Sequence, residues 1–152
     1  MNIADRALMQ AHAGERLTAL LSSYQRLTGE VLADSLDALW ESQHPVVAHD
    51  VKDPPHFFYG NHAALTLFGI KARKFIRMAS YKSALPDARE DRAAMLAKLE
   101  ETDIVTGYSG VRIAADRSRF RINDAVIWNL HDTAGKRVGQ AATFADWTPI
   151  KD

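Results

Sequence analysis

The sequence contains no cysteine among its 152 residues. This absence excludes disulfide bonds, thiolate metal sites, a cysteine nucleophile and cysteine-based photochemistry or redox sensing. The chain also lacks an excess of charge of either sign, because 19 basic side chains balance 19 acidic ones. A neutral balance argues against a surface that attaches generally to polyanions. We therefore expect no nucleic-acid partner.

Long apolar runs are missing as well. No stretch approaches the roughly 18 consecutive apolar residues that a membrane-spanning helix needs. The first residues show neither the basic start nor the cleavage motif of a secretory signal. We expect a cytoplasmic protein that does not bind membranes. A hydrophobic content of 47% over this length predicts one core and one globular unit.

The stretch from Tyr108 to Trp147 contains three runs of alternating apolar and polar residues. The central run, 119–130, places five apolar side chains at even spacing, which is typical of a strand with one buried face: Phe120, Ile122, Val126, Trp128 and Leu130. Runs 110–113 and 137–144 flank it, and turn-forming residues at 115–118 and 132–135 separate the three. The pattern predicts an antiparallel meander of three strands.

The first forty residues have a helical pattern. Apolar residues recur at steps of three and four between Leu17 and Leu39. Gly14 and Gly29 interrupt the pattern, so we expect a short first helix, a main helix and a final turn that ends near Gln43. The apolar stripe either packs on its own domain or forms a dimer interface, for which the candidate residues are Leu20, Leu21, Tyr24, Leu27 and Val31.

Two further strands and several helices are expected between Pro45 and the meander. Pro45 stops the preceding helix, and residues 46–50 and 52–61 read as a first hairpin with a proline-containing turn. Asn61 is a typical N-cap for a short helix, and Gly69 stands where a C-terminal cap glycine belongs. A longer helix is predicted after Pro86. One antiparallel sheet of five strands, with the intervening helices on one face, accommodates this order.

The residues from about Asp50 to Trp147 resemble the MEKHLA domain, a PAS-related family. The segments that carry the resemblance are YGNHAAL, SYKSALPDAREDR, YSGVRI, RFRI, VIWNLHD and GQAATFADW, in this order. The resemblance implies an α+β PAS-like fold and a sensory or interaction module, and it implies no particular reaction. We interpret residues 1–43 as an N-terminal helical extension and residues 44–152 as the PAS-like domain.

The resemblance also implies a small-molecule pocket between the inner face of the sheet and the short helices. Strand parity points the Gln140 amide into this space, where it must find a ligand, a backbone group or the Trp128 indole as its partner. The candidate pocket residues are Tyr59, Phe68, Phe120, Trp128, Gln140 and Phe144. The sequence identifies neither the ligand nor a cofactor.

Several polar groups have both a functional and a structural interpretation. Asp124 is a candidate general base, or it belongs to a β-bulge formed with Asn123. The parity of the meander puts four arginines on its outer face, which is either a solvated surface or a site for an acidic partner: Arg112, Arg117, Arg119 and Arg121.

Two groups of histidines, His44 with His49 and His56 with His62, lack the spacing of metal ligands. We predict no metal site and no catalytic residue.

The combined observations favour a non-catalytic regulatory module that binds a small molecule or mediates protein contact. The alternative is a small enzyme of the cone-shaped α+β type, which would use the same cavity for acid–base chemistry. We also predict a homodimer, because the helical stripe would otherwise expose an apolar patch that is unusual for a monomer.

Overall fold

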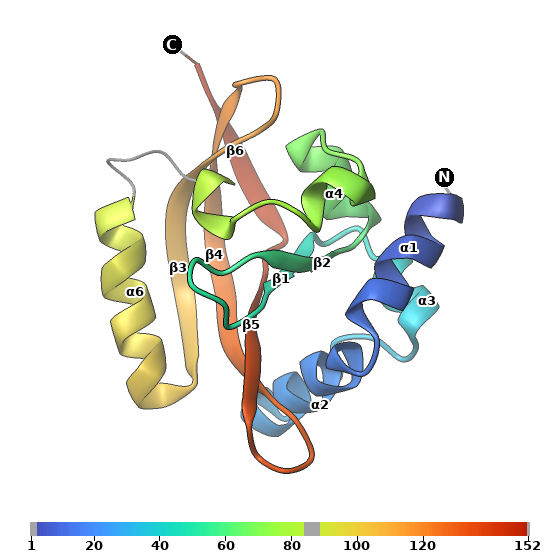
Figure 1. The fold of residues 1–152 in the computed structure, drawn as a ribbon. Coiled ribbons are helices and arrows are strands. Elements are labelled where there is room, and N and C mark those ends of the chain that lie inside the picture. The colour runs from blue at the N-terminus through green and yellow to red at the C-terminus, as the bar shows by residue number, and fades with distance from the viewer. Residues whose placement is uncertain (1–2, 84–88, 152) are drawn as a thin grey trace.

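The computed structural model describes residues 3–83 and 89–151 (Figure 1). It opens with three helices, α1 (Ile3–Ala13), α2 (Arg16–Thr28) and α3 (Leu36–Glu41). Gly14 and Gly29 separate them with φ angles of 55° and 76°, which L side chains rarely adopt. The two helix breaks predicted from the sequence are therefore confirmed.

Within the described residues, six strands form one antiparallel sheet. They are β1 (Val46–His49), β2 (Phe57–Gly60), β3 (Ile104–Ile113), β4 (Arg119–His131), β5 (Arg137–Thr143) and β6 (Asp146–Ile150). The order β2-β1-β5-β4-β3 joins the first hairpin to the meander, as predicted. The sequence pattern missed β6, a short strand with a proline in its interior that pairs with residues 119–123 of β4.

The segment between β2 and β3 supplies the remaining helices. These are α4 (His62–Phe68), α5 (Ala72–Phe75), a 3₁₀ turn at Ser80–Ser83 and α6 (Arg89–Thr102). Asn61 caps α4 through its side chain and Gly69 ends it with φ 67°, so both predicted caps are confirmed. Part of the SYKSALPDAREDR segment, residues 84–88, lies outside the described residues.

The two faces of the sheet carry different helices, and β4 shows this most directly. The Trp128 indole donates a hydrogen bond of 3.2 Å to the Leu20 carbonyl of α2. The next residue, Asn129, donates one of 3.1 Å to the Leu99 carbonyl of α6. Because successive side chains of a strand point to opposite faces, α2 and α6 cover opposite faces of the sheet. Figure 1 shows the two helices on either side of it.

A β-bulge divides β4. Ile122 pairs with Gly110 and Ala125 with Tyr108, so β4 contains one residue more than its partner over this stretch. Asp124 there has φ 53°, and Gly107 across the ladder has φ 67°. The bulge expected at Asn123–Asp124 is therefore present, but its consequence was missed. Side chains before and after it switch faces, so the prediction that Phe120 and Trp128 share one face is wrong.

The N-terminal helices contribute to the same hydrophobic core as the sheet. Met9, Leu17, Leu20 and Trp40 are almost completely buried and belong to one cluster with Trp128 and other sheet residues. Burial of this kind is the main source of folding free energy. The apolar stripe thus packs largely on its own chain. Within the described residues, no helix combines the length and the apolar character needed to cross a bilayer.

The buried side chain of Asn61 links three separate backbone segments through four hydrogen bonds. Its carbonyl oxygen accepts hydrogen bonds from the backbone N–H groups of Val46 and Ala64, at 2.9 and 3.1 Å. Its amide nitrogen donates to the carbonyls of Leu39 and His44, at 3.1 and 3.0 Å. The end of α3, the start of β1 and the first turn of α4 therefore depend on one side chain.

Replacement of Asn61 by alanine is expected to lower the free energy of unfolding by about 2–4 kcal/mol, because buried N–H and carbonyl groups lose their partners. Urea denaturation monitored by circular dichroism measures the change. The matched control is Asn123→Ala, which removes exposed hydrogen bonds to Asp146 and Thr148. We expect the control to cost less than about 1 kcal/mol. Equal losses for the two variants would contradict this role of Asn61.

Candidate functional site

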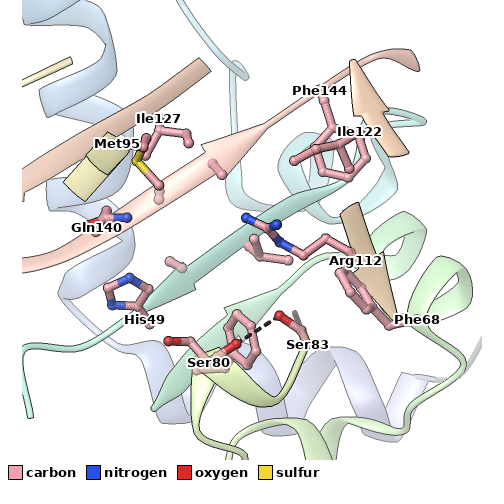
Figure 2. Close-up of a pocket in the computed structure, with 15 residues that line it drawn as sticks. His49, Phe68, Ser80, Ser83, Met95, Arg112, Ile122, Ile127, Gln140 and Phe144 are labelled. Carbon is pink, nitrogen blue, oxygen red and sulfur yellow. Dashed lines mark hydrogen bonds between the residues drawn. The ribbon is translucent and has the colours of Figure 1, made fainter. Parts of the chain in front are cut away.

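A cavity lies between the sheet and the helices that follow β2. Its volume is about 50 Å³, which is room for about four water molecules. Strands β1, β2, β3, β4 and β5, helices α4 and α6 and the 3₁₀ turn all contribute to its wall, as the close-up in Figure 2 shows. Most lining side chains are apolar, and five are polar: His49, Ser80, Ser83, Arg112 and Gln140.

Arg112 brings a positive charge into this cavity. The residue is 9% exposed, and Figure 2 shows its side chain extending from β3 into the cavity. One guanidinium nitrogen donates a 3.0 Å hydrogen bond to the Val111 carbonyl, and the guanidinium carbon lies 5.8 Å from the centre of the Tyr108 ring. Among the side chains that the structure describes, no carboxylate lies within 4.0 Å of it. Within these described residues, the two groups known to contact the charge, the Val111 carbonyl and the Tyr108 ring, are neutral.

Gln140 places an amide on the same wall. The residue is 4% exposed, and its Oε1 atom has no hydrogen-bond partner within residues 3–83 and 89–151. Asn129, its neighbour across the ladder, has hydrogen-bond partners for both its oxygen and its nitrogen. The Asn129 amide donates to Leu99 and Asp103 and accepts from Arg137. A buried acceptor without a partner carries a desolvation cost, which a donor that enters the cavity would remove.

His49 and Ser83 complete the polar part of the wall with hydrogen bonds that hold them in place. The His49 Nδ1 atom lies 2.9 Å from the Asp50 carbonyl, so it carries the proton of this contact. The Ser83 hydroxyl donates to the Ser80 carbonyl at 2.8 Å. These contacts orient an imidazole and a hydroxyl toward the cavity on rigid backbone.

A second hollow of about 170 Å³ adjoins the cavity on the side of α6. His49 and Gln140 line both spaces, so they stand between the cavity and this second hollow. The second hollow carries the charged residues Glu100 and Arg137.

The residues predicted to line the pocket divide into two groups. Phe68, Gln140 and Phe144 line the cavity. Phe120, Tyr59 and Trp128 do not belong to its wall. The Phe120 ring packs on Phe68, with ring centroids 5.4 Å apart, beyond the cavity. Tyr59 is fully buried outside the lining, and burial raises the pKa of its phenol, which stays neutral.

Trp128 lies on the opposite face of the sheet, beneath α2, where its ring contacts Tyr24 at a centroid distance of 4.9 Å. The reason is the bulge at Asp124, which reverses the parity of the second half of β4. Asp124 itself is exposed and does not line the cavity, so the position on the concave face that a general base would need is not the one it occupies.

Sequence reasoning assigned Arg112 to the outer face, and the structure reverses this assignment. Val111 and Ile113 suggested the buried side of the strand, yet both are only half-buried, whereas Arg112 is buried. The signal that could have placed Arg112 is its pairing with Phe120, a residue expected on the inner face. His49, Ser80 and Ser83 were also missed, because their burial depends on contacts between distant segments. The described residues hold no group of three or more potential metal ligands.

The sheet order, the covering helices and the enclosed cavity define a domain of the PAS class, and solved structures agree. The chain is similar to the PAS domain of a protein from Colwellia psychrerythraea, with 16% identity, a TM-score of 0.61 and coverage of 72% of this chain and 91% of that chain. A light-oxygen-voltage domain studied with a flavin analogue is 18% identical, with a TM-score of 0.60 and coverage of 77% of this chain and 84% of that chain. The light-state dimer of the fungal blue-light photoreceptor Vivid is 12% identical, with a TM-score of 0.62 and coverage of 86% of this chain and 93% of that chain.

The chain belongs to the MEKHLA domain family, whose profile matches residues 15–149. The match begins well before Asp50, where the resemblance was expected to start, and it includes α2 and α3. No curated protein matches the sequence. At these identities the solved structures establish the fold, and the family match establishes which branch of the fold this chain represents.

Replacement of Gln140 by methionine, which has a similar shape, is expected to raise the free energy of unfolding by about 1 kcal/mol, because an acceptor without a partner leaves the core. Urea denaturation of the ligand-free chain measures the effect. The control is Asn129→Leu, which removes a buried amide with three partners. We expect the control to be destabilised by about 2 kcal/mol or more. A Gln140→Met variant as unstable as the control would show that the amide has a structural partner.

Proposed function

We propose that this chain is a non-catalytic regulatory module that binds a small molecule in the cavity between the sheet and α6. The observation that carries the proposal is that a buried cation, Arg112, and a buried hydrogen-bond acceptor, Gln140, line the same cavity. Both groups are costly to bury without partners. A ligand that satisfies them would repay that cost and would couple binding to the stability of the domain.

The composition of the wall favours binding over acid–base chemistry. His49 is a titratable group there, but the described lining residues include no aspartate or glutamate. General acid–base catalysis requires a proton donor and acceptor placed around the reacting atoms. Asp124, the carboxylate considered for this task, lies outside the cavity. The enzyme alternative therefore has no supporting observation.

The size of the cavity supports a ligand much smaller than a flavin. Pockets for larger ligands typically enclose roughly 300 Å³ or more, compared with about 50 Å³ here. A three-ring flavin does not fit this space, and without cysteine the chain cannot form a thiol adduct with one. Binding of a flavin by a light-oxygen-voltage relative is therefore not transferred to this protein.

Native mass spectrometry of the purified full chain is expected to show a bound small molecule, or a screened compound is expected to raise the Tm. A ligand at a hundredfold excess over its Kd stabilises the fold by about 2.7 kcal/mol. Ala142→Leu, which fills the cavity, should abolish binding, whereas Ala145→Leu at an exposed position should not. A wild-type chain that retains nothing and responds to no compound would overturn the proposal.

We further propose that the chain forms a homodimer through α2 and the segment that follows it. Leu21, Tyr24 and Leu27 are half-buried, while Val31 and Leu36 are 57% and 41% exposed. Leu20 is removed from the predicted interface, because it is 0% exposed inside its own chain. The relative Vivid, which forms a light-state dimer, is similar over 86% of this chain. This likeness supports a dimer of this fold.

Light scattering of the full chain at tens of micromolar is expected to give twice the mass of one chain. Val31→Asp should shift the equilibrium to monomers, because it buries a charge in the proposed interface. The control is Val51→Asp, since Val51 is 50% exposed on the β1–β2 loop. Truncation before Gln43 is unsuitable, because it removes the core residues Leu17, Leu20 and Trp40. A monomeric wild-type chain would contradict the proposal.

A further inference from the structure

We propose that the ligand is a short 2-hydroxy carboxylate, such as glycolate or lactate. The inference deepens the proposed small-molecule binding and rests on it. Three properties of the cavity lead to this class: a buried cation with no carboxylate partner among the described residues, a buried acceptor with no donor among the same residues, and a volume of about 50 Å³. Each property restricts a different part of the ligand.

The first restriction is a negative charge on the ligand. Arg112 is nine-tenths buried, yet its contacts within the described residues are a backbone carbonyl and the Tyr108 ring, both neutral. A guanidinium has five N–H donors, and its planar fork matches the two oxygens of a carboxylate. Such a pair places the compensating charge next to the cation and satisfies several donors at once. Lysine or a neutral donor would not offer this geometry.

The second restriction is a hydrogen-bond donor on the ligand. The Gln140 Oε1 atom accepts no hydrogen bond from the described residues, and the amide lines the same cavity as Arg112. A carboxylate alone cannot donate to it, whereas a hydroxyl can. An ammonium group could also donate, but it would bring a second positive charge into a wall that contains Arg112 and no described carboxylate. The hydroxyl is therefore the better match.

The third restriction is size. The cavity has room for about four water molecules, which corresponds to a ligand of about four to six non-hydrogen atoms. Apart from His49, Ser80 and Ser83, the remaining wall is apolar, with Phe57, Phe68, Ile122, Ile127 and Phe144 in contact with the cavity. A methyl or methylene group packs against these apolar side chains. A dicarboxylate would bring a second negative charge, and the described wall contains no second arginine or lysine to meet it.

The experiment titrates the full chain with lactate, propionate and lactamide by calorimetry, with NMR as a second readout. Propionate lacks the hydroxyl and lactamide lacks the charge. We expect lactate to bind most tightly. Arg112→Met should weaken lactate binding at least about tenfold, the loss typical of a charged hydrogen bond. Arg121→Met, which changes an exposed arginine of β4 that pairs with Val111, should bind like the wild type. Gln140→Met should bind lactate and propionate equally.

Two outcomes overturn the inference. The first is an unchanged lactate affinity in folded Arg112→Met, and the second is equal binding of lactate and lactamide by the wild type. If Arg112→Met does not fold, Arg112→Lys keeps the charge without the fork, and it must bind lactate more weakly than the wild type. A third result is that neutral compounds bind the wild type but not Ala142→Leu, and that carboxylates bind neither. In that case the proposed function stands and the carboxylate inference fails. If nothing binds, both fail.

Discussion

The β-bulge at Asp124 is the constraint on which the arrangement of this domain depends. One additional residue in β4, held at φ 53° opposite Gly107, divides the strand into two halves that pair with different partners. Residues 119–123 pair with β6 and residues 126–131 pair with β5. The switch of faces lets Ile122 and Ile127 both line the cavity, although an odd number of positions separates them. Without it, one of them would face α2.

The two halves of β4 then face two different layers. Trp128 is bound to the Leu20 carbonyl and contacts Tyr24, so α2 is tied to one face. Asn129 is bound to Leu99 and Asp103, so α6 is tied to the other. Because these hydrogen bonds come from consecutive residues, α2 and α6 are anchored to the same point of β4 from opposite faces of the sheet.

The cavity brings several polar side chains into an otherwise apolar core. The buried side chain of Asn61 is fully satisfied by four hydrogen bonds. The Gln140 Oε1 atom has no partner among the described residues, and it shares its space with Arg112, a buried cation without a described carboxylate beside it. Departures from local rules tend to occur at functional sites, where the cost is offset by ligand binding. Membership of the MEKHLA family and the PAS fold fit a sensory role without defining the ligand.

The sequence by itself determined the local elements, because their signals lie within a few residues. Gly14 and Gly29 end helices, Asn61 caps α4, and the alternating runs form the meander. Even the bulge was visible as Asp124 in an apolar run. Only the tertiary structure decided which face each side chain occupies. Arg112 lies inside and Trp128 on the opposite face, because a single inserted residue reverses strand parity and because burial depends on which helices cover the sheet.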